Sequence, residues 1–235
     1  MPQPFLYNLI DKAIFDYRII EKGDRILVGA SGGKDSTALI EYLAARKKRQ
    51  KDDFEFLALN VCTDFGGGLP PGIKALFEEW NVPLESVFVD VNGRIKEGYK
   101  MSCYWCSTQR RKELIAFAEE NGFNKIALGH HMDDILETAL MNALGKGELS
   151  TMIPSLKYDK YPLTIVRPLC YADEKTIIDH AKAGGYFGWT CTCNYQDNSA
   201  RKTARRRLEL LTEGDRKAKE RLFKALKNIK KEYLP

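Results

Sequence analysis

The segment SGGKDS, residues 31–36, lies between an apolar run and a helical pattern, and this arrangement constrains the fold more than any other feature of the chain. The preceding run RILVGA favours a strand and is followed by a turn signal. The following stretch TALIEYLAARKK keeps an apolar stripe on one side of a helix. Gly32 and Gly33 let backbone N–H groups approach a ligand, and the helix start adds partial positive charge. The sequence therefore predicts a phosphate-binding loop between a strand and a helix.

Strand and helix patterns alternate along the rest of the chain. The expected strands cover residues 25–31, 54–62, 86–91, 125–131 and 164–169. Helical patterns open the chain at 4–22, follow each of these strands and return in the tail, where the last helix is expected at 216–233. This alternation predicts an α/β fold: a parallel sheet with helices on both faces, plus N-terminal and C-terminal helices. We expect an N-terminal helix over residues 1–22, a main domain over 23–200 and a basic helical tail over 201–235.

Three polar segments follow predicted strands: Ser31 to Ser36, Asn60 to Asp64 and Gly129 to His131. Ligands of parallel sheets bind outside the carboxyl ends of the strands. These segments, which are distant in the sequence, are therefore expected to share one crevice.

Composition places the chain among ordinary globular proteins, because hydrophobic residues make up 44% and charged residues 29% of it. No stretch approaches the roughly 18 to 20 apolar residues of a membrane span, and no signal-peptide pattern opens the chain. We therefore expect a cytoplasmic location and no membrane partner.

The basic residues are concentrated in the tail. From residue 199 onward there are 13 Lys or Arg and 5 Asp or Glu, a surplus larger than the net charge of +5 of the whole chain. One interpretation is a surface that binds the RNA phosphate backbone, and the other is a solvated helical face. For the last helix the solvated face is preferred. The RNA interpretation is at least as good for ARKTARRR, whose basic residues are Arg201, Lys202, Arg205, Arg206 and Arg207.

Six cysteines in a chain without a secretion signal argue against a disulfide framework. Cys103 and Cys106 are three residues apart where a helical pattern begins, so a helix would bring both sulfurs to one side. The helix start and three following basic side chains would favour thiolates: Arg110, Arg111 and Lys112. Cys191 and Cys193 could complete a site. The spacing fits an iron–sulfur cluster or a zinc site, and the first pair alone could also be a redox dithiol.

Four segments resemble, in order and spacing, the TtcA-type tRNA thiolation enzymes of the PP-loop ATP pyrophosphatase superfamily: SGGKDS, CYWCSTQRRKEL, LGHHMDDILETALMN and IVRPLCYADEKTI. The first resembles SGGxDS, the pyrophosphate-binding loop of that superfamily. The resemblance spans roughly residues 20–200, so that 23–200 would be the catalytic domain. It implies an ATP-dependent tRNA sulfurtransferase that adenylates the C2 oxygen of a tRNA pyrimidine. Sulfur from a [4Fe-4S] cluster, or alternatively from a Cys persulfide, would then displace AMP.

Within this family, one branch makes 2-thiocytidine in the anticodon loop and a sister branch thiolates a uridine of the T-loop. The sister branch carries additional zinc-binding cysteine pairs near both ends, and the six cysteines here include no such pairs. The resemblance therefore favours an anticodon-loop cytidine as the target.

The resemblance also implies roles for individual residues. The phosphates of ATP would bind Ser31, Gly32, Gly33, Lys34, Asp35 and Ser36, with Asp35 near Mg²⁺, and the adenine would lie near Asn60 and Gly129. Asp133 and Asp134 would hold magnesium, a basic side chain or the base, or would simply favour a helix start. Lys112 would stabilise phosphate charge or lie on an exposed helix face.

The expected cluster ligands are Cys103, Cys106 and Cys193, with Cys191 as the alternative third ligand and zinc as the alternative metal. The family usually has CxxC at the third ligand, whereas this chain has Cys191-Thr192-Cys193. Alignment on the following residues 195–198 favours Cys193. Tyr104 and Trp105, between the first two cysteines, could stack on an unpaired base or shield the cluster.

The expected partners are tRNA and a sulfur donor, either sulfide or a cysteine desulfurase system, with a homodimer as a further option. Two other functions fit part of the sequence. One is a PP-loop ATP pyrophosphatase that acts on a small molecule and has a structural zinc site. The other is a non-catalytic iron–sulfur sensor that binds nucleic acid, and the intact SGGKDS argues against it.

Overall fold

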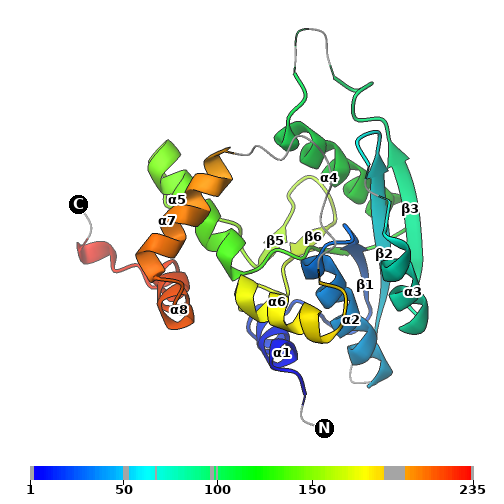
Figure 1. The fold of residues 1–235 in the computed structure, drawn as a ribbon, viewed down its shortest axis with the longest axis horizontal. Helices are drawn as coiled ribbons and strands as arrows, with labels where there is room; N and C mark the ends of the chain where they lie inside the picture. Colours follow the sequence, from blue (N-terminus) through cyan, green and yellow to red (C-terminus); the bar gives the residue numbers. More distant parts are fainter. Residues whose placement is uncertain are drawn as a thin grey trace.

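The structure is a computed structural model that describes residues 3–49, 53–66, 68–95, 98, 100–187 and 199–233. Within these residues, six strands form one sheet in the order β3-β2-β1-β4-β6-β5 (Figure 1). The parallel strands are β1 (Asp24–Gly29), β2 (Phe54–Thr63), β3 (Leu84–Val89), β4 (Lys125–Ala127) and β6 (Thr164–Val166). The edge strand β5 (Ser155–Lys157) pairs antiparallel with β6. The predicted α/β fold is confirmed, and β5 is an antiparallel addition that the sequence patterns did not indicate.

Side-chain alternation along the strands divides the core into two layers. Ile26 and Val28 of β1 point into the larger layer, and Leu27 between them points into the smaller one. The larger layer is covered by α1 (Phe5–Tyr17), α2 (Lys34–Lys48), α3 (Pro71–Glu79), α5 (Met132–Lys146) and α6 (Glu174–Ala183). The smaller layer is covered by α4 (Cys103–Glu120). Helices thus lie on both faces of the sheet, as predicted.

The crossovers place several helix starts at one edge of the sheet. Helices α2, α4, α5 and α6 each follow a parallel strand, so each of them begins at the carboxyl edge. Partial positive charge from four helix N-termini is therefore directed toward this edge. The three predicted segments, 31–36, 60–64 and 129–131, all contribute residues to one cavity there, as the sequence predicted.

The C-terminal part of the described chain forms α7 (Ser199–Thr212), α8 (Arg216–Ala225) and a 3-10 turn, Lys231–Tyr233. The prediction of one helix over 216–233 is wrong in extent, because α8 ends at Ala225, with Leu226 as its C-cap. Leu208 of α7 and Phe223 of α8 join the larger core layer. Across the residues that the structure describes, no helix combines the length and apolar character needed to cross a bilayer.

Candidate active site

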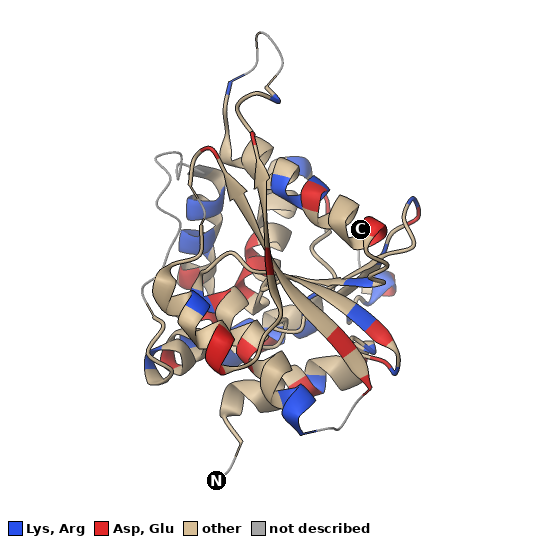
Figure 2. Ribbon diagram, turned by 90° about the vertical axis from the view of Figure 1, so that its right-hand side faces the viewer, with Lys and Arg blue, Asp and Glu red and all other residues tan. Residues whose placement is uncertain are grey.

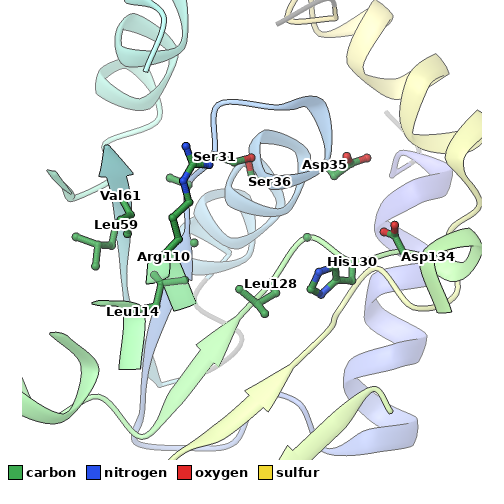
Figure 3. Close-up of a pocket in the computed structure, with 13 residues that line it drawn as sticks. Ser31, Asp35, Ser36, Leu59, Val61, Arg110, Leu114, Leu128, His130 and Asp134 are labelled. Carbon is green, nitrogen blue, oxygen red and sulfur yellow. The ribbon is translucent and has the colours of Figure 1, made fainter. Parts of the chain in front are cut away.

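A cavity of about 320 Å³ opens at the carboxyl edge of β1, β2 and β4 (Figure 3). Its polar wall contains Ser31, Asp35, Ser36 and Asp134, and Arg110 extends from α4 toward the loop that carries Ser31. Its apolar wall is formed by Leu59, Val61, Leu114 and Leu128. Polar groups on one side and aliphatic groups on the other suit a ligand with a charged part and a flat apolar part.

The loop at residues 31–36 is held by its own side chains. The Ser31 and Ser36 hydroxyls lie 3.0 Å apart, and the Ser36 hydroxyl donates to the Gly33 carbonyl at 3.1 Å. Gly33 is the N-cap of α2, and its N–H donates to Ser31 Oγ at 3.3 Å. Gly32 has φ +76°, and a Cβ there would come within 3.2 Å of Leu69 and Pro70. A backbone cradle that only glycine can adopt without strain therefore precedes the helix start.

Lys34 and Asp35 lie side by side at the first turn of α2. Lys34 Nζ is 3.2 Å from Asp35 Oδ1 but makes its hydrogen bond to Oδ2 at 3.3 Å. Within the described residues, Asp35 Oδ1 is buried without a hydrogen bond. Burial by itself would lower the pKa of Lys34, but Asp35 and Glu174 raise it above its usual value. The loop thus offers a protonated lysine and an unsatisfied carboxylate oxygen, as expected of a site that binds phosphate and a cation.

Asn60 and Gly129 contact the backbone at either end of this loop. Asn60 is buried and does not line the cavity, and its Nδ2 donates to the Ala30 carbonyl at 2.7 Å. Its Oδ1 accepts a hydrogen bond from the Cys62 thiol at 2.9 Å. A Cβ on Gly129 would lie 3.0 Å from the backbone nitrogen of Ser36. Asn60 therefore fixes the strand end before the loop, and Gly129 allows the start of α2 to approach β4.

Two histidines join the loop to the start of α5. His131 is buried as the N-cap of α5, and its Nε2 lies 3.4 Å from Asp134 Oδ2 and 3.9 Å from Asp35 Oδ1. The two carboxylates therefore flank one imidazole. Burial lowers the pKa of His130, which lines the cavity, to about 4 although Asp134 opposes this shift. His130 is neutral at pH 7, and its Nδ1 accepts from Arg167 Nε at 3.3 Å. His130 therefore lines the cavity, and His131 lies buried behind it at the start of α5.

Asp133 and Asp134 are neighbours in sequence, but their side chains lie in different environments. Asp134 lines the cavity, accepts from the backbone N–H of His131 at 3.1 Å and lies 3.3 Å from Arg201. Burial would raise the pKa of Asp134, but the two histidines and Arg201 lower it overall. Asp133 points away from the cavity, with Oδ1 2.7 Å from Lys219 Nζ and Oδ2 accepting from the Glu174 N–H at 2.8 Å. Among the roles expected for Asp133, the contact with a basic side chain is the one seen in the structure, and that side chain is Lys219.

Arg110, rather than Lys112, is the basic residue of α4 at the cavity. Lys112 is exposed and does not line the cavity. Arg110 lines it, and its Nε is buried without a hydrogen bond in the described part of the chain. The spacing gave a signal for this residue, because Arg110 follows Cys106 by four positions and so lies one turn further along the same helix face.

Cys103 and Cys106 occupy the first turn of α4, and both are partly buried. Ser102 caps this helix by accepting from the Trp105 N–H at 3.1 Å. Both sulfurs therefore lie at the positive end of an 18-residue helix. Cys191 and Cys193 lie outside the described residues. In the described part, no group of three or more metal-binding side chains is present.

The two aromatic residues between the cysteines differ in environment. The Trp105 ring packs against the smaller core layer, and its indole N–H donates to the Val91 carbonyl at 3.3 Å. Tyr104 is 78% exposed. Trp105 therefore has a structural position, and Tyr104 is the one of the two that a base could reach.

The basic tail does not form a separate positive arm. Arg205 Nε lies 2.8 Å from Glu137 Oε1, and Arg201 and Lys219 pair with Asp134 and Asp133. In the view of Figure 2, basic and acidic residues are interspersed over the ribbon. Arg201 and Arg205 thus pair with acidic residues of α5 that lie far away in the sequence, and the RNA interpretation of ARKTARRR stays a prediction.

Comparison with known proteins places this geometry in a family. The family model ATP_bind_3, described as a PP-loop domain, matches residues 6–211. A tRNA-cytidine(32) 2-sulfurtransferase of Legionella pneumophila strain Paris is 35% identical over 97% of this chain and 82% of the relative. A protein of the same name from Geotalea uraniireducens is 36% identical over 97% and 92%.

Two solved structures are similar in fold. The U34-tRNA thiolase NcsA from Methanococcus maripaludis, with its [4Fe-4S] cluster, has a TM-score of 0.77 at 22% identity and covers 96% of this chain and 80% of its own. NMN synthetase from Francisella tularensis has a TM-score of 0.51 at 12% identity, with 95% and 93% covered. The arrangement of sheet, loop and helices is thus shared with both proteins.

Proposed function

The chain belongs to the PP-loop family of tRNA 2-sulfurtransferases, and from this premise we propose that its cavity is where ATP activates a tRNA cytidine for exchange of the C2 oxygen by sulfur. The protein is an ATP-dependent tRNA thiolation enzyme. One observation carries the assignment of the site: the phosphate-binding loop, two carboxylates and Arg110 line one cavity. Helix α4, which contributes Arg110 to the cavity, begins with Cys103 and Cys106.

ATP would bind with its phosphates on residues 31–36. The glycine cradle and the start of α2 supply N–H donors, and the Ser31 and Ser36 hydroxyls add two more. Lys34 would add a positive charge, and the unsatisfied oxygen of Asp35 would hold Mg²⁺ together with Asp134. These groups fit ATP because they supply donors for the phosphates and acceptors for the metal.

The apolar wall would hold the two bases. Adenine fits against Leu59, Val61 and Gly129, where the strand ends leave an aliphatic surface. The cytidine would enter beside Arg110 and Leu114, with exposed Tyr104 available for stacking at the entrance. The position of Arg110 suits stabilisation of the charge that develops on the α-phosphate.

The chemistry would proceed in two displacements. The C2 oxygen of the cytidine attacks the α-phosphorus of ATP, the bond to the bridging oxygen breaks and pyrophosphate leaves. The C2 oxygen then carries AMP and departs with it when sulfur bonds to C2. Arg110 and the loop hold the phosphate through both displacements. His130, which also lines the cavity, is neutral and adds no charge beside the phosphate.

The residues of α4 fit a [4Fe-4S] cluster. Cys103 and Cys106 supply two soft sulfur ligands at a helix start, and we propose Cys193, with Cys191 as the alternative, as the third. When bound, such a cluster supplies sulfide sulfur as the nucleophile that replaces AMP at C2. The sulfur would be delivered by sulfide or a cysteine desulfurase system, and a homodimer is compatible with this scheme.

The test uses the full-length protein, purified without oxygen, with ATP, Mg²⁺, sulfide and unmodified tRNA. We expect AMP and 2-thiocytidine to form together, with the nucleoside measured by mass spectrometry of digested tRNA. Cys103→Ser and Cys106→Ser should abolish thiolation and leave ATP binding intact. AMP formation with a metabolite and without RNA would contradict the proposal.

A further inference from the structure

One carboxylate joins the phosphate-binding loop to the C-terminal helices. Lys34 Nζ of the loop lies 3.3 Å from Glu174 Oε1 at the start of α6. Arg205 of α7 lies 3.9 Å from the same oxygen atom. The Glu174 side chain is 28% exposed and Arg205 49%, so neither side chain is part of the apolar core. Glu174 thus shares one oxygen between a lysine of the ATP site and an arginine outside it.

Arg205 is held in this position from its other side. Its Nε lies 2.8 Å from Glu137 Oε1, and the Glu137 side chain is 1% exposed. Burial by itself would lower the pKa of Arg205, but Glu137 and Glu174 raise it above its usual value. The charge of Arg205 is therefore fixed beside Glu174, and Arg205 partly neutralises the carboxylate that holds Lys34.

This arrangement has a consequence for ATP binding. Lys34 does not line the cavity, and among the described residues it pairs with two carboxylates, Asp35 and Glu174. A phosphate that recruits Lys34 must compete with these carboxylates, and Asp35 can remain beside Lys34 if it also approaches the metal. Glu174 is the partner that Lys34 would have to leave.

We propose that Glu174 is a positioning residue that competes with the phosphates of ATP for Lys34, and that Arg205 limits this competition by binding the same carboxylate oxygen. The inference rests on the proposed function, because it requires ATP at residues 31–36. It assigns to the basic tail a role in setting the affinity of the enzyme for ATP. The two residues act through Lys34, so they are positioning residues and touch no reacting atom.

The proposal predicts effects of opposite sign. Glu174→Gln removes the competitor and should lower the Kd of ATP roughly two- to five-fold, the range for a partly exposed ion pair. Arg205→Met leaves Glu174 to Lys34 alone and should raise the Kd by a similar factor. Arg205→Lys keeps the charge and should restore most of the wild-type affinity. If these residues only supported the fold, both neutral variants would weaken ATP binding.

A double variant separates this competition from a general electrostatic effect. If Arg205 acts through Glu174, Arg205→Met should change the Kd little in the Glu174→Gln background. If it only adds positive charge to the region, the two effects should add. Arg206→Met is the matched control, because Arg206 is an exposed arginine one position further along α7 than Arg205. Among the described residues, it has no ion-pair partner. It should leave the Kd unchanged.

The measurement is calorimetric titration of ATP with Mg²⁺ into the full-length protein without tRNA, with thermal unfolding of every variant as a check on folding. Shifts of the same sign, additive effects in the double variant, or an Arg206→Met effect equal to that of Arg205→Met would overturn the inference. These outcomes leave the proposed function intact. A wild-type protein that binds no ATP would instead contradict the proposed function, and this inference with it.

Discussion

The phosphate-binding loop and the charged interface between α5 and the C-terminal helices use similar residue types in opposite ways. In the loop, the Ser31 and Ser36 hydroxyls contact each other across five positions, and Asp35 Oδ1, 3.2 Å from Lys34 Nζ, accepts no hydrogen bond from the described residues. At the interface, Asp133 and Lys219 pair across 86 positions. A partly exposed carboxylate with a spare oxygen, paired only with its neighbour in the loop, is available to a ligand, whereas a buried one neutralised by a distant helix stabilises the fold.

The strongest test of this distinction is on the loop side. Asp35→Asn keeps the size of the side chain but removes the charge that we assign to Mg²⁺. We expect kcat for thiolation to fall by roughly 10²- to 10³-fold, the range for losing one electrostatic group at a reacting centre. The unfolding midpoint should stay close to that of the wild type, because the Asp35 side chain is 29% exposed. Thiolation assays and denaturant unfolding measure the two quantities. A variant that loses stability but retains activity would reverse the assignment.

At the interface between α5 and the C-terminal helices, we expect a substitution to reduce stability. Lys219→Met removes the partner of buried Asp133, where the two side chains are 7% and 4% exposed. An uncompensated buried charge should lower the free energy of unfolding by about 3 kcal/mol. Urea unfolding of the full-length protein measures this difference.

Arg221→Met provides the control on the same helix, because Arg221 is 76% exposed and lies 3.8 Å from Asp215. It should cost at most about 0.5 kcal/mol. Equal losses in the two variants would show that the interface contributes no more than an ordinary surface ion pair.

This contrast explains how much the sequence could predict. The loop was predicted with its residues, because its hydrogen bonds and glycine conformations depend on six consecutive positions. The α/β architecture followed from local patterns of apolar residues in the same way. The short strand β5 has three residues and pairs at the sheet edge, so it left no pattern of its own.

The interface could not be predicted by the same means. ARKTARRR contains no acidic residue, which suggested an RNA surface, but its neutralising partners Asp134, Glu137 and Glu174 come from α5 and α6. Which of two adjacent aspartates faces the cavity also depends on where α8 places Lys219. Such pairings are properties of the assembled fold and leave no local signal.

Helix α4 offers an intermediate case, in which the sequence located the helix but did not single out Arg110, the basic residue of α4 that lines the cavity. Arg110→Met should lower kcat/KM for tRNA thiolation by roughly 10- to 100-fold, as expected for a hydrogen-bonding group to a charged ligand. Lys112→Met, two positions away and exposed, should stay within about two-fold of the wild type if it makes no such contact. Steady-state kinetics at saturating ATP measures both. A larger effect of Lys112→Met would restore the assignment that the sequence favoured.

The smallest expected effect tests whether the loop depends on a distant segment after all. Gly129 lies 93 positions from Ser36, yet a Cβ on Gly129 would come within 3.0 Å of the Ser36 backbone nitrogen. Gly129→Ala must therefore displace the first turn of α2, and we expect the KM for ATP to rise by roughly five-fold, since a shift of this kind costs on the order of 1 kcal/mol. Gly145→Ala is the control, because a Cβ there meets nothing within 4 Å. ATP-dependent pyrophosphate release at varied ATP concentration measures the KM of both variants. If Gly129→Ala leaves the KM unchanged, the loop holds its conformation without support from β4. The function of the loop then depends on residues 31–36 alone.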